Sequence, residues 1–228
     1  MISIIIPTYN EASTIADLVA FIKINTVNAD IEIIVSDGGS TDATVELAIK
    51  AGASALLSPD KGRAAQMNFG ASIARGQILY FVHADCLPPK TFVTDIENAV
   101  SNKADAGRYR TNFMSSSLLL KLNAFFTRFN WFVCYGGDQT LFVTKALFET
   151  IGGFDETKLI MEDYDISIRI KQSGTYVILN NYVQVSVRKY EANSWWVVQR
   201  ANYKAIQMYK AGASSEVIAT AYRKCIKP

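Results

Sequence analysis

Three carboxylates crowd into four residues at EDYD, residues 162–165 of this chain. Like charges held this close repel one another, which favours proton uptake by one of them. One carboxylate of such a cluster could therefore serve as a general base. The structural alternative is a helix start, because acidic side chains there interact favourably with the helix dipole.

A second acidic segment is HAD, residues 83–85, which ends an apolar run. If this run is a strand, His83 and Asp85 point to the same side of it. Asp85 is suited to hold a divalent cation against phosphate oxygens, because Mg²⁺ is often bound by one or two carboxylates plus phosphates. His83 is the only histidine of the chain, and a hydrogen-bonded structural role is its alternative.

Asp37 begins DGGST, with Gly38 and Gly39 behind it. Glycines let the backbone approach a flat ligand closely. A carboxylate at this point can accept hydrogen bonds from a nucleobase or from ribose hydroxyls. An ordinary turn between a strand and a helix, with the aspartate as its cap, is the alternative.

Two cations, Lys61 and Arg63, precede a predicted helix that also carries Asn68. Cations beside a helix N-terminus can bind phosphates, although a solvated basic turn would have the same sequence pattern. The chain has neither GxGxxG after its first strand nor GxxxxGK[ST] anywhere. Dinucleotide oxidoreductases and P-loop NTPases are therefore poor matches.

The loop GGDQ, residues 136–139, contains Gly137 and Asp138. It could contact a sugar or an acceptor hydroxyl, or it could be a turn that leads into the next strand. The sequence leaves both options open.

Strands alternate with helices in the first part of the chain, and these elements must position the acidic clusters. Apolar runs predict strands at 2–6, 31–36, 55–58 and 77–85, and helical spacing predicts helices at 14–24, at 45–53 and in the segment ending near Ala74. Such an order implies a parallel sheet, in which ligands bind beyond the carboxyl ends of the strands. PTYNE, SDGGSTD and HADC occupy those ends, so we expect them to meet at one edge.

The second half of the chain is less regular. We predict strands at 106–113 and 138–144, a helix over KALFET that ends at Gly152-Gly153, a helix over EDYDISIRIKQS that ends at Gly174, and two further strands at 176–181 and 183–189. The predicted fold class is α/β, with a central sheet flanked by helices.

Half of the 228 residues are hydrophobic, which allows a sizeable core in one α/β domain or two small ones. A net charge of +2 is too small to predict nucleic acid as a partner. The three cysteines form no CxxC pair, so a zinc knuckle or a thioredoxin-type site is not expected. We expect no signal peptide and no membrane span, and hence a cytoplasmic protein.

Together, PTYNE, VSDGGSTD, HAD in place of a DxD motif, GGFDE and EDYDISIRI resemble the family-2 glycosyltransferases, which have the GT-A fold. The resemblance covers roughly residues 1–190, and residues 61–85 are especially similar to a compact bacterial subgroup. It implies a mostly parallel sheet with a nucleotide-binding half at 1–105 and an acceptor and catalytic half at 106–190. A C-terminal helical extension at 191–228 would pack on this domain.

The resemblance implies an inverting glycosyltransferase with a nucleotide-sugar donor, often a UDP-sugar, and a divalent metal, Mn²⁺ or Mg²⁺. Asp163 matches the general base of the family, beside Glu162. The metal would lie on Asp85, and the acceptor near Gly137 and Asp138. The donor site would comprise Pro7, Thr8, Asn10, Glu11, Asp37, Gly38, Lys61, Arg63, Asn68, Ala84 and Asp85.

His83 departs from the family pattern, because it stands where DxD has an aspartate. Histidine suits Mn²⁺ better than Mg²⁺, so metal binding through Asp85 alone would be weaker or would need another ligand. Arg188 and Lys189 occupy the position of a basic pair in the subgroup. They could close over the diphosphate, or lie on the surface after an edge strand.

Two alternative functions stay open. The altered DxD suggests a nucleotide-sugar-binding protein with little transferase activity. A sugar-phosphate nucleotidyltransferase shares the general architecture, although its glycine- and basic-rich loop after the first strand is missing here.

Two aromatic segments bear on the acceptor. Residues 116–135 have apolar side chains at helical spacing, and residues 195–214 form a second aromatic helix with basic residues. These segments could be core, cover the acceptor, form a homodimer contact, or touch the inner face of the membrane. We expect the acceptor to be a sugar or a lipid-linked molecule.

Overall fold

The computed structural model describes residues 1–136 and 139–227. Its elements follow one another in the order β1 (Ile2–Thr8), α1 (Ile15–Asn25), β2 (Ile31–Asp37), α2 (Thr44–Ala51), β3 (Ser54–Leu57), α3 (Arg63–Ile73), β4 (Ile78–Phe81), β5 (Cys86–Leu87), α4 (Phe92–Ser101), β6 (Ala106–Phe113), α5 (Leu118–Phe126), η1 (Phe132–Cys134), β7 (Leu141–Thr144), α6 (Lys145–Thr150), α7 (Glu162–Ser173), β8 (Tyr176–Val185), α8 (Arg188–Ala192), α9 (Trp195–Lys210) and α10 (Ser215–Arg223).

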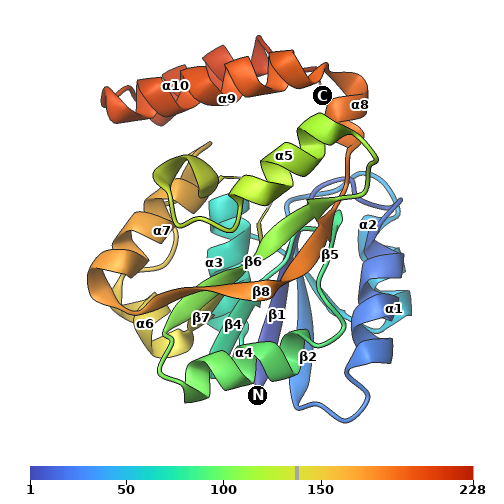
Figure 1. The fold of residues 1–228 in the computed structure, drawn as a ribbon. Helices are drawn as coiled ribbons and strands as arrows, with labels where there is room; N and C mark the ends of the chain where they lie inside the picture. The colour runs from blue at the N-terminus through green and yellow to red at the C-terminus, as the bar shows by residue number, and fades with distance from the viewer. Residues whose placement is uncertain (137–138, 228) are drawn as a thin grey trace.

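The strands form one sheet in the order β3-β2-β1-β4-β7-β6-β8-β5. β1 to β4 are parallel, as the sequence predicts, and β8 is parallel to β6. β7 and β5 run antiparallel to their neighbours. In Figure 1 the N-terminus lies at the bottom, and β1 runs upward toward α5 and the C-terminal helices. The predicted α/β fold with a mostly parallel sheet is confirmed, and the carboxyl ends of β1, β2 and β4 share one edge.

β1 lies inside the sheet, and all of its residues are buried. The apolar stripe of α1 covers one face with Ile15, Leu18, Val19 and Ile22. On the other face α3 packs closely, because Gly70 lies against Ile5: a Cβ at Gly70 would stand 2.5 Å from Ile5 Cγ2. This close approach holds α3 and its first residue, Arg63, near the carboxyl end of β1.

The strand predicted at 77–85 is shorter, because β4 ends at Phe81. His83 and Asp85 lie in a turn in which the Cys86 N–H donates to the His83 carbonyl at 3.0 Å. The chain turns here because the next two residues form β5 and pair with the end of β8. The prediction that His83 and Asp85 share one face of a strand was therefore wrong.

The two strands predicted at 176–189 are one strand, β8, which ends at Val185. It pairs with β6 along its length, with a register shift between Tyr109 and Arg110 of β6. Arg188 and Lys189, which lay within the strand predicted at 183–189, instead begin helix α8. The strand predicted at 138–144 is β7, which begins at Leu141.

The helix predicted in 116–135 is confined to α5, and η1 follows after a turn. The buried side chain of Arg108, on β6, contacts the segment that follows α5. Its guanidinium donates to the carbonyls of Thr127 at 2.7 Å and Phe129 at 3.1 Å. These hydrogen bonds tie the segment after α5 to β6.

The C-terminal helices α9 and α10 pack against each other and lie over α5 (Figure 1). An apolar cluster joins them to the start of α7, with Met161 and Tyr164 on one side and Ala205, Ile206 and Ile218 on the other. This layer therefore stands next to the acidic residues that begin α7. Within the described ranges, no helix combines the length and the apolar character needed to cross a membrane.

Candidate active site

The loops after β1 and β2 are tied into one unit. The Asn10 N–H donates to Ser40 Oγ at 2.8 Å, and the Thr41 N–H donates to Asn10 Oδ1 at 2.8 Å. Asn10 has a φ of 56°, in the left-handed region that asparagine tolerates better than most residues. PTYNE and SDGGST thus form one polar edge, with Pro7 and Thr8 buried beneath it at the end of β1.

Asp37 is buried below this edge, with 1% of its surface exposed. Its carboxylate accepts hydrogen bonds from the Thr8 hydroxyl at 3.0 Å and from the N–H groups of Gly39 at 2.8 Å and Ser40 at 2.7 Å. The side chain thereby shapes the turn that Gly38 begins. Any contact of Asp37 with a base or ribose would be additional to this structural role.

A guanidinium joins α3 to the acidic start of α7. Arg63 donates to Glu162 Oε1 at 3.1 Å and lies 4.0 Å from Asp163 Oδ2. The Glu162 side chain is 6% exposed and that of Asp163 is 20% exposed. Asp165, the third acid of EDYD, instead pairs with Arg169 of its own helix at 2.6 Å. The acidic cluster is thus divided, and only two of its carboxylates turn toward Arg63.

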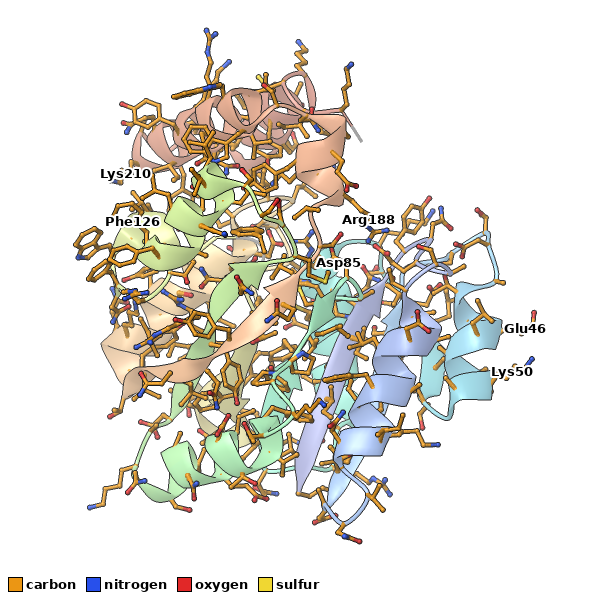
Figure 2. All side chains as sticks on the ribbon, turned by 45° about the vertical axis from the view of Figure 1, so that its right-hand side comes forward. Glu46, Lys50, Asp85, Phe126, Arg188 and Lys210 are labelled. Atoms are coloured by element: carbon orange, nitrogen blue, oxygen red, sulfur yellow. The ribbon has the colours of Figure 1, made fainter. Side chains whose placement is uncertain are left out.

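A second guanidinium lies between the loop after β1 and the turn after β4. Arg188 Nη2 is 3.0 Å from Glu11 Oε2 and 3.7 Å from Asp85 Oδ2. Figure 2 shows Asp85 and Arg188 next to each other, near the point where β8 leads into α8. The pairing of β5 with β8 brings them together, because Asp85 immediately precedes β5 and Arg188 closely follows β8.

His83 is linked electrostatically to Arg63. Burial, together with the positive charge of Arg63, lowers the pKa of His83 to about 3. Its imidazole is therefore neutral at neutral pH, which is the form that binds metal ions. Ala84 packs into the apolar core, so at this position only the backbone is available to a ligand.

Asn68 fastens the GGFDE loop to α3. Its amide N–H groups donate to the Phe154 carbonyl at 2.9 Å and to Glu156 at 2.7 Å, and its oxygen accepts from the Phe154 N–H at 2.9 Å. The side chain that we expected to support the nucleotide is thus engaged with this loop.

Lys61 is exposed in the loop before α3, where its Cε would stand 4.0 Å from a Cβ placed on Gly39. Gly137 and Asp138, which we expected near the acceptor, lie outside the described residues. The structure therefore assembles two groups of predicted residues. One joins Glu11, Asp85 and Arg188, and the other joins Arg63, Glu162 and Asp163.

A cavity of about 750 Å³ adjoins Glu162 and Asp163. It is lined by α5, the start of α7 and the two C-terminal helices, and its wall includes Gln199, Asn202 and Ile206 of α9. Sequence reasoning did not identify these three residues. These residues are spaced i, i+3, i+7, which places them on one face of a helix. This spacing could have indicated that they share one surface.

Comparisons with known proteins identify the family of the chain. Residues 3–148 match the family model for Glycosyl transferase family 2. A PGL/p-HBAD biosynthesis glycosyltransferase of Mycobacterium bovis is 29% identical over 210 residues, which cover 83% of this chain and 76% of that protein.

Among solved structures, S. aureus TarS in complex with UDP-GlcNAc has a TM-score of 0.69 at 16% identity, over 98% of this chain and 71% of that one. The mannosyltransferase PcManGT from Pyrobaculum calidifontis, in complex with GDP-Man and Mn²⁺, has a TM-score of 0.68 at 17% identity. The match covers 98% of this chain and 69% of that one. The chain belongs to glycosyl transferase family 2, and it is a glycosyltransferase with the GT-A fold.

Proposed function

We propose that this glycosyltransferase moves a sugar from a nucleoside-diphosphate sugar to an acceptor hydroxyl, with inversion at the anomeric carbon and Asp163 as the general base. One observation supports this most directly. Arg63 holds Glu162 and Asp163 together in the wall of the cavity. This wall lies on the side of the molecule that also carries the loops after β1 and β2. A carboxylate in this place can receive the proton of a hydroxyl bound in the cavity.

The donor would bind over the polar edge formed by the loops after β1 and β2. Pro7, Thr8, Asn10 and Glu11 would line the nucleoside site, together with the turn of Asp37 and Gly38. The cations Lys61 and Arg188 would meet the diphosphate, since both flank this edge. The solved neighbours carry UDP-GlcNAc and GDP-Man, and a UDP-sugar is the donor that we expect here.

In the proposed reaction the acceptor oxygen attacks the anomeric carbon from the side opposite the diphosphate. The new C–O bond forms as the bond to the diphosphate breaks, and the diphosphate leaves with that electron pair. The hydroxyl proton passes to a carboxylate oxygen of Asp163. Arg188 would stabilise the charge that develops on the leaving group, and Glu162 would hold Arg63 beside the base.

A divalent cation would be held by Asp85 and His83. The Asp85 carboxylate is 34% exposed and His83 is neutral, so an oxygen donor and a nitrogen donor follow β4, a set that suits Mn²⁺. No group of three such ligands occurs among the residues that the structure describes, so phosphate oxygens of the donor would have to complete the coordination. When bound, such an ion supplies positive charge to the departing diphosphate.

Asp163→Asn tests the base, because it keeps the shape of the side chain and removes its basicity. We expect the transfer rate to fall by roughly 10²- to 10⁴-fold. Stabilisation of the protein by UDP in a thermal melt should be unchanged, since the donor edge is intact. Asp165→Asn is the matched control on the same helical turn, and it should retain most of the transfer rate. Equal losses in the two variants, or a wild-type rate for Asp163→Asn, would refute the assignment.

A further inference from the structure

We propose that the acceptor is amphipathic, a hydroxyl carried on an apolar body, and that this body occupies the cavity between α5, α7 and the C-terminal helices. The inference rests on the proposed function, since it assigns the second substrate of the same site. The apolar body could be an alkyl chain or an aromatic ring system, and the experiment below separates the two.

The first observation is the composition of the cavity. At about 750 Å³ it is as large as pockets that hold whole small molecules. Glu162 and Asp163 supply carboxylates to its wall. Much of the remaining wall is apolar or aromatic, with Phe113, Ile160, Met161, Tyr164, Ala205 and Ile206 among its members. A bound hydroxyl would thus have a base available in the wall, and the group that carries it would have apolar side chains to contact.

The second observation is the rim. Phe126, Trp131 and Val133 all line the cavity, yet they are 39%, 53% and 58% exposed. The rings are ordered by contact with one another, since Phe126 and Trp131 have centroids 6.2 Å apart. The same apolar surface therefore continues from the inside of the cavity to the outside of the molecule, where Figure 2 shows Phe126 at the surface.

The rim is continuous in sequence with the outward face of α5. Leu118, Leu122 and Phe125 are 80%, 48% and 45% exposed. Soluble proteins seldom expose several adjoining apolar side chains to water unless these side chains form a binding surface. Several of them are aliphatic, and aliphatic groups cannot stack on a sugar face as aromatic rings do. An apolar extension of the acceptor accounts for both kinds of side chain.

The experiment measures acceptor binding directly and needs no turnover. Octyl β-glucoside below its micellar concentration, phenyl β-glucoside and glucose are titrated into the protein with UDP present, by calorimetry. We expect one or both glucosides to bind at least about tenfold more tightly than glucose, because their apolar groups leave water. Binding of only the octyl compound assigns an alkyl acceptor, and binding of only the phenyl compound an aromatic one.

Trp131→Ser combined with Val133→Ser should weaken glucoside binding about tenfold. The control is Ile24→Ser combined with Val27→Ser, which removes side chains that are 73% and 80% exposed at the end of α1 and should leave binding unchanged. Glucose binding as tightly as both glucosides, or equal binding by the two double variants, would overturn the proposal. Since stabilisation by a nucleoside diphosphate reports on the donor edge alone, its absence with both UDP and GDP would refute the proposed function, whereas its presence without glucoside binding refutes only this inference.

Discussion

The Arg63 guanidinium donates to Glu162 Oε1 at 3.1 Å, across 99 positions of sequence. The Glu162 side chain is almost fully buried, whereas that of Arg63 is about half exposed. A buried carboxylate therefore depends on a cation from the opposite half of the chain. Because Arg63 begins α3 and Glu162 begins α7, this pair also fixes the start of α7, where Asp163 lies, relative to the central sheet.

Replacing Arg63 by Met should destabilise the protein and slow the reaction. Glu162 would stay buried without its charged donor, which should lower the free energy of unfolding by about 1–3 kcal/mol. Transfer should fall roughly tenfold or more as Asp163 loses its neighbour. Urea unfolding and initial rates measure the two effects. Arg75→Met is the control, since it breaks a pair with Glu32 whose arginine is 76% exposed and should cost at most about 1 kcal/mol. Equal losses of unfolding free energy in the two variants would show that Arg63 stabilises the protein no more than the exposed Arg75 does.

Asn68→Ala should act on stability more than on donor binding. It removes hydrogen bonds that fasten residues 154 and 156 to α3, and we expect a loss of about 1–3 kcal/mol in unfolding free energy. Ser72→Ala, one turn further along α3, removes only an exposed bond to the Phe69 carbonyl and should be nearly neutral. A large rise in the KM for the donor at unchanged stability would instead favour the direct contact with the nucleotide that the sequence suggested.

Arg188→Ala should weaken donor binding. The variant leaves the carboxylates of Glu11 and Asp85 without the cation that lies 3.0 and 3.7 Å from them. Two negative groups would then face the diphosphate, and we expect the KM for the donor to rise about tenfold or more. Arg200→Ala, an exposed cation on α9, controls for the loss of net charge. Identical KM values for the two variants would exclude Arg188 from the donor site.

Lys171 should make stability depend on pH in the alkaline range. Burial, and after it the positive charge of Arg108, lowers the pKa of Lys171 from 10.5 to about 8. Between these values the unfolded chain binds more protons than the folded chain, so the unfolding free energy rises with pH. Below pH 8 the cost of the buried charge is present in full.

The measurement is the difference in unfolding free energy between the wild type and Lys171→Met. It should increase in favour of the wild type from pH 8 to 10.5. Taking the difference cancels the titration of tyrosines common to both proteins. If the difference stays constant between pH 8 and 10.5, the pKa of Lys171 is not lowered in the folded protein.

The sequence predicted the regular part of the fold well. The four parallel strands and the helices α1 to α3 lie close to their expected positions, because hydrophobic spacing over a few residues already selects helix or strand. It did not predict that β4 would end before His83, or that residues 176–185 would be one strand. Both depend on β8, whose partners β5 and β6 lie far away in sequence.

The sequence by itself determined which polar clusters follow the strands, and hence that PTYNE, SDGGST and HAD would gather at one edge of a parallel sheet. Only the tertiary structure decided which charges pair. Arg63 reaches Glu162 and Arg188 reaches Glu11 and Asp85 because α3, α7 and α8 are brought together by sheet pairing. The same holds for the cavity, which exists because α9 and α10 pack back over α5 and α7. Local periodicity reflects contacts between near neighbours in the chain, whereas ion pairs and cavities depend on contacts between segments that the chain separates.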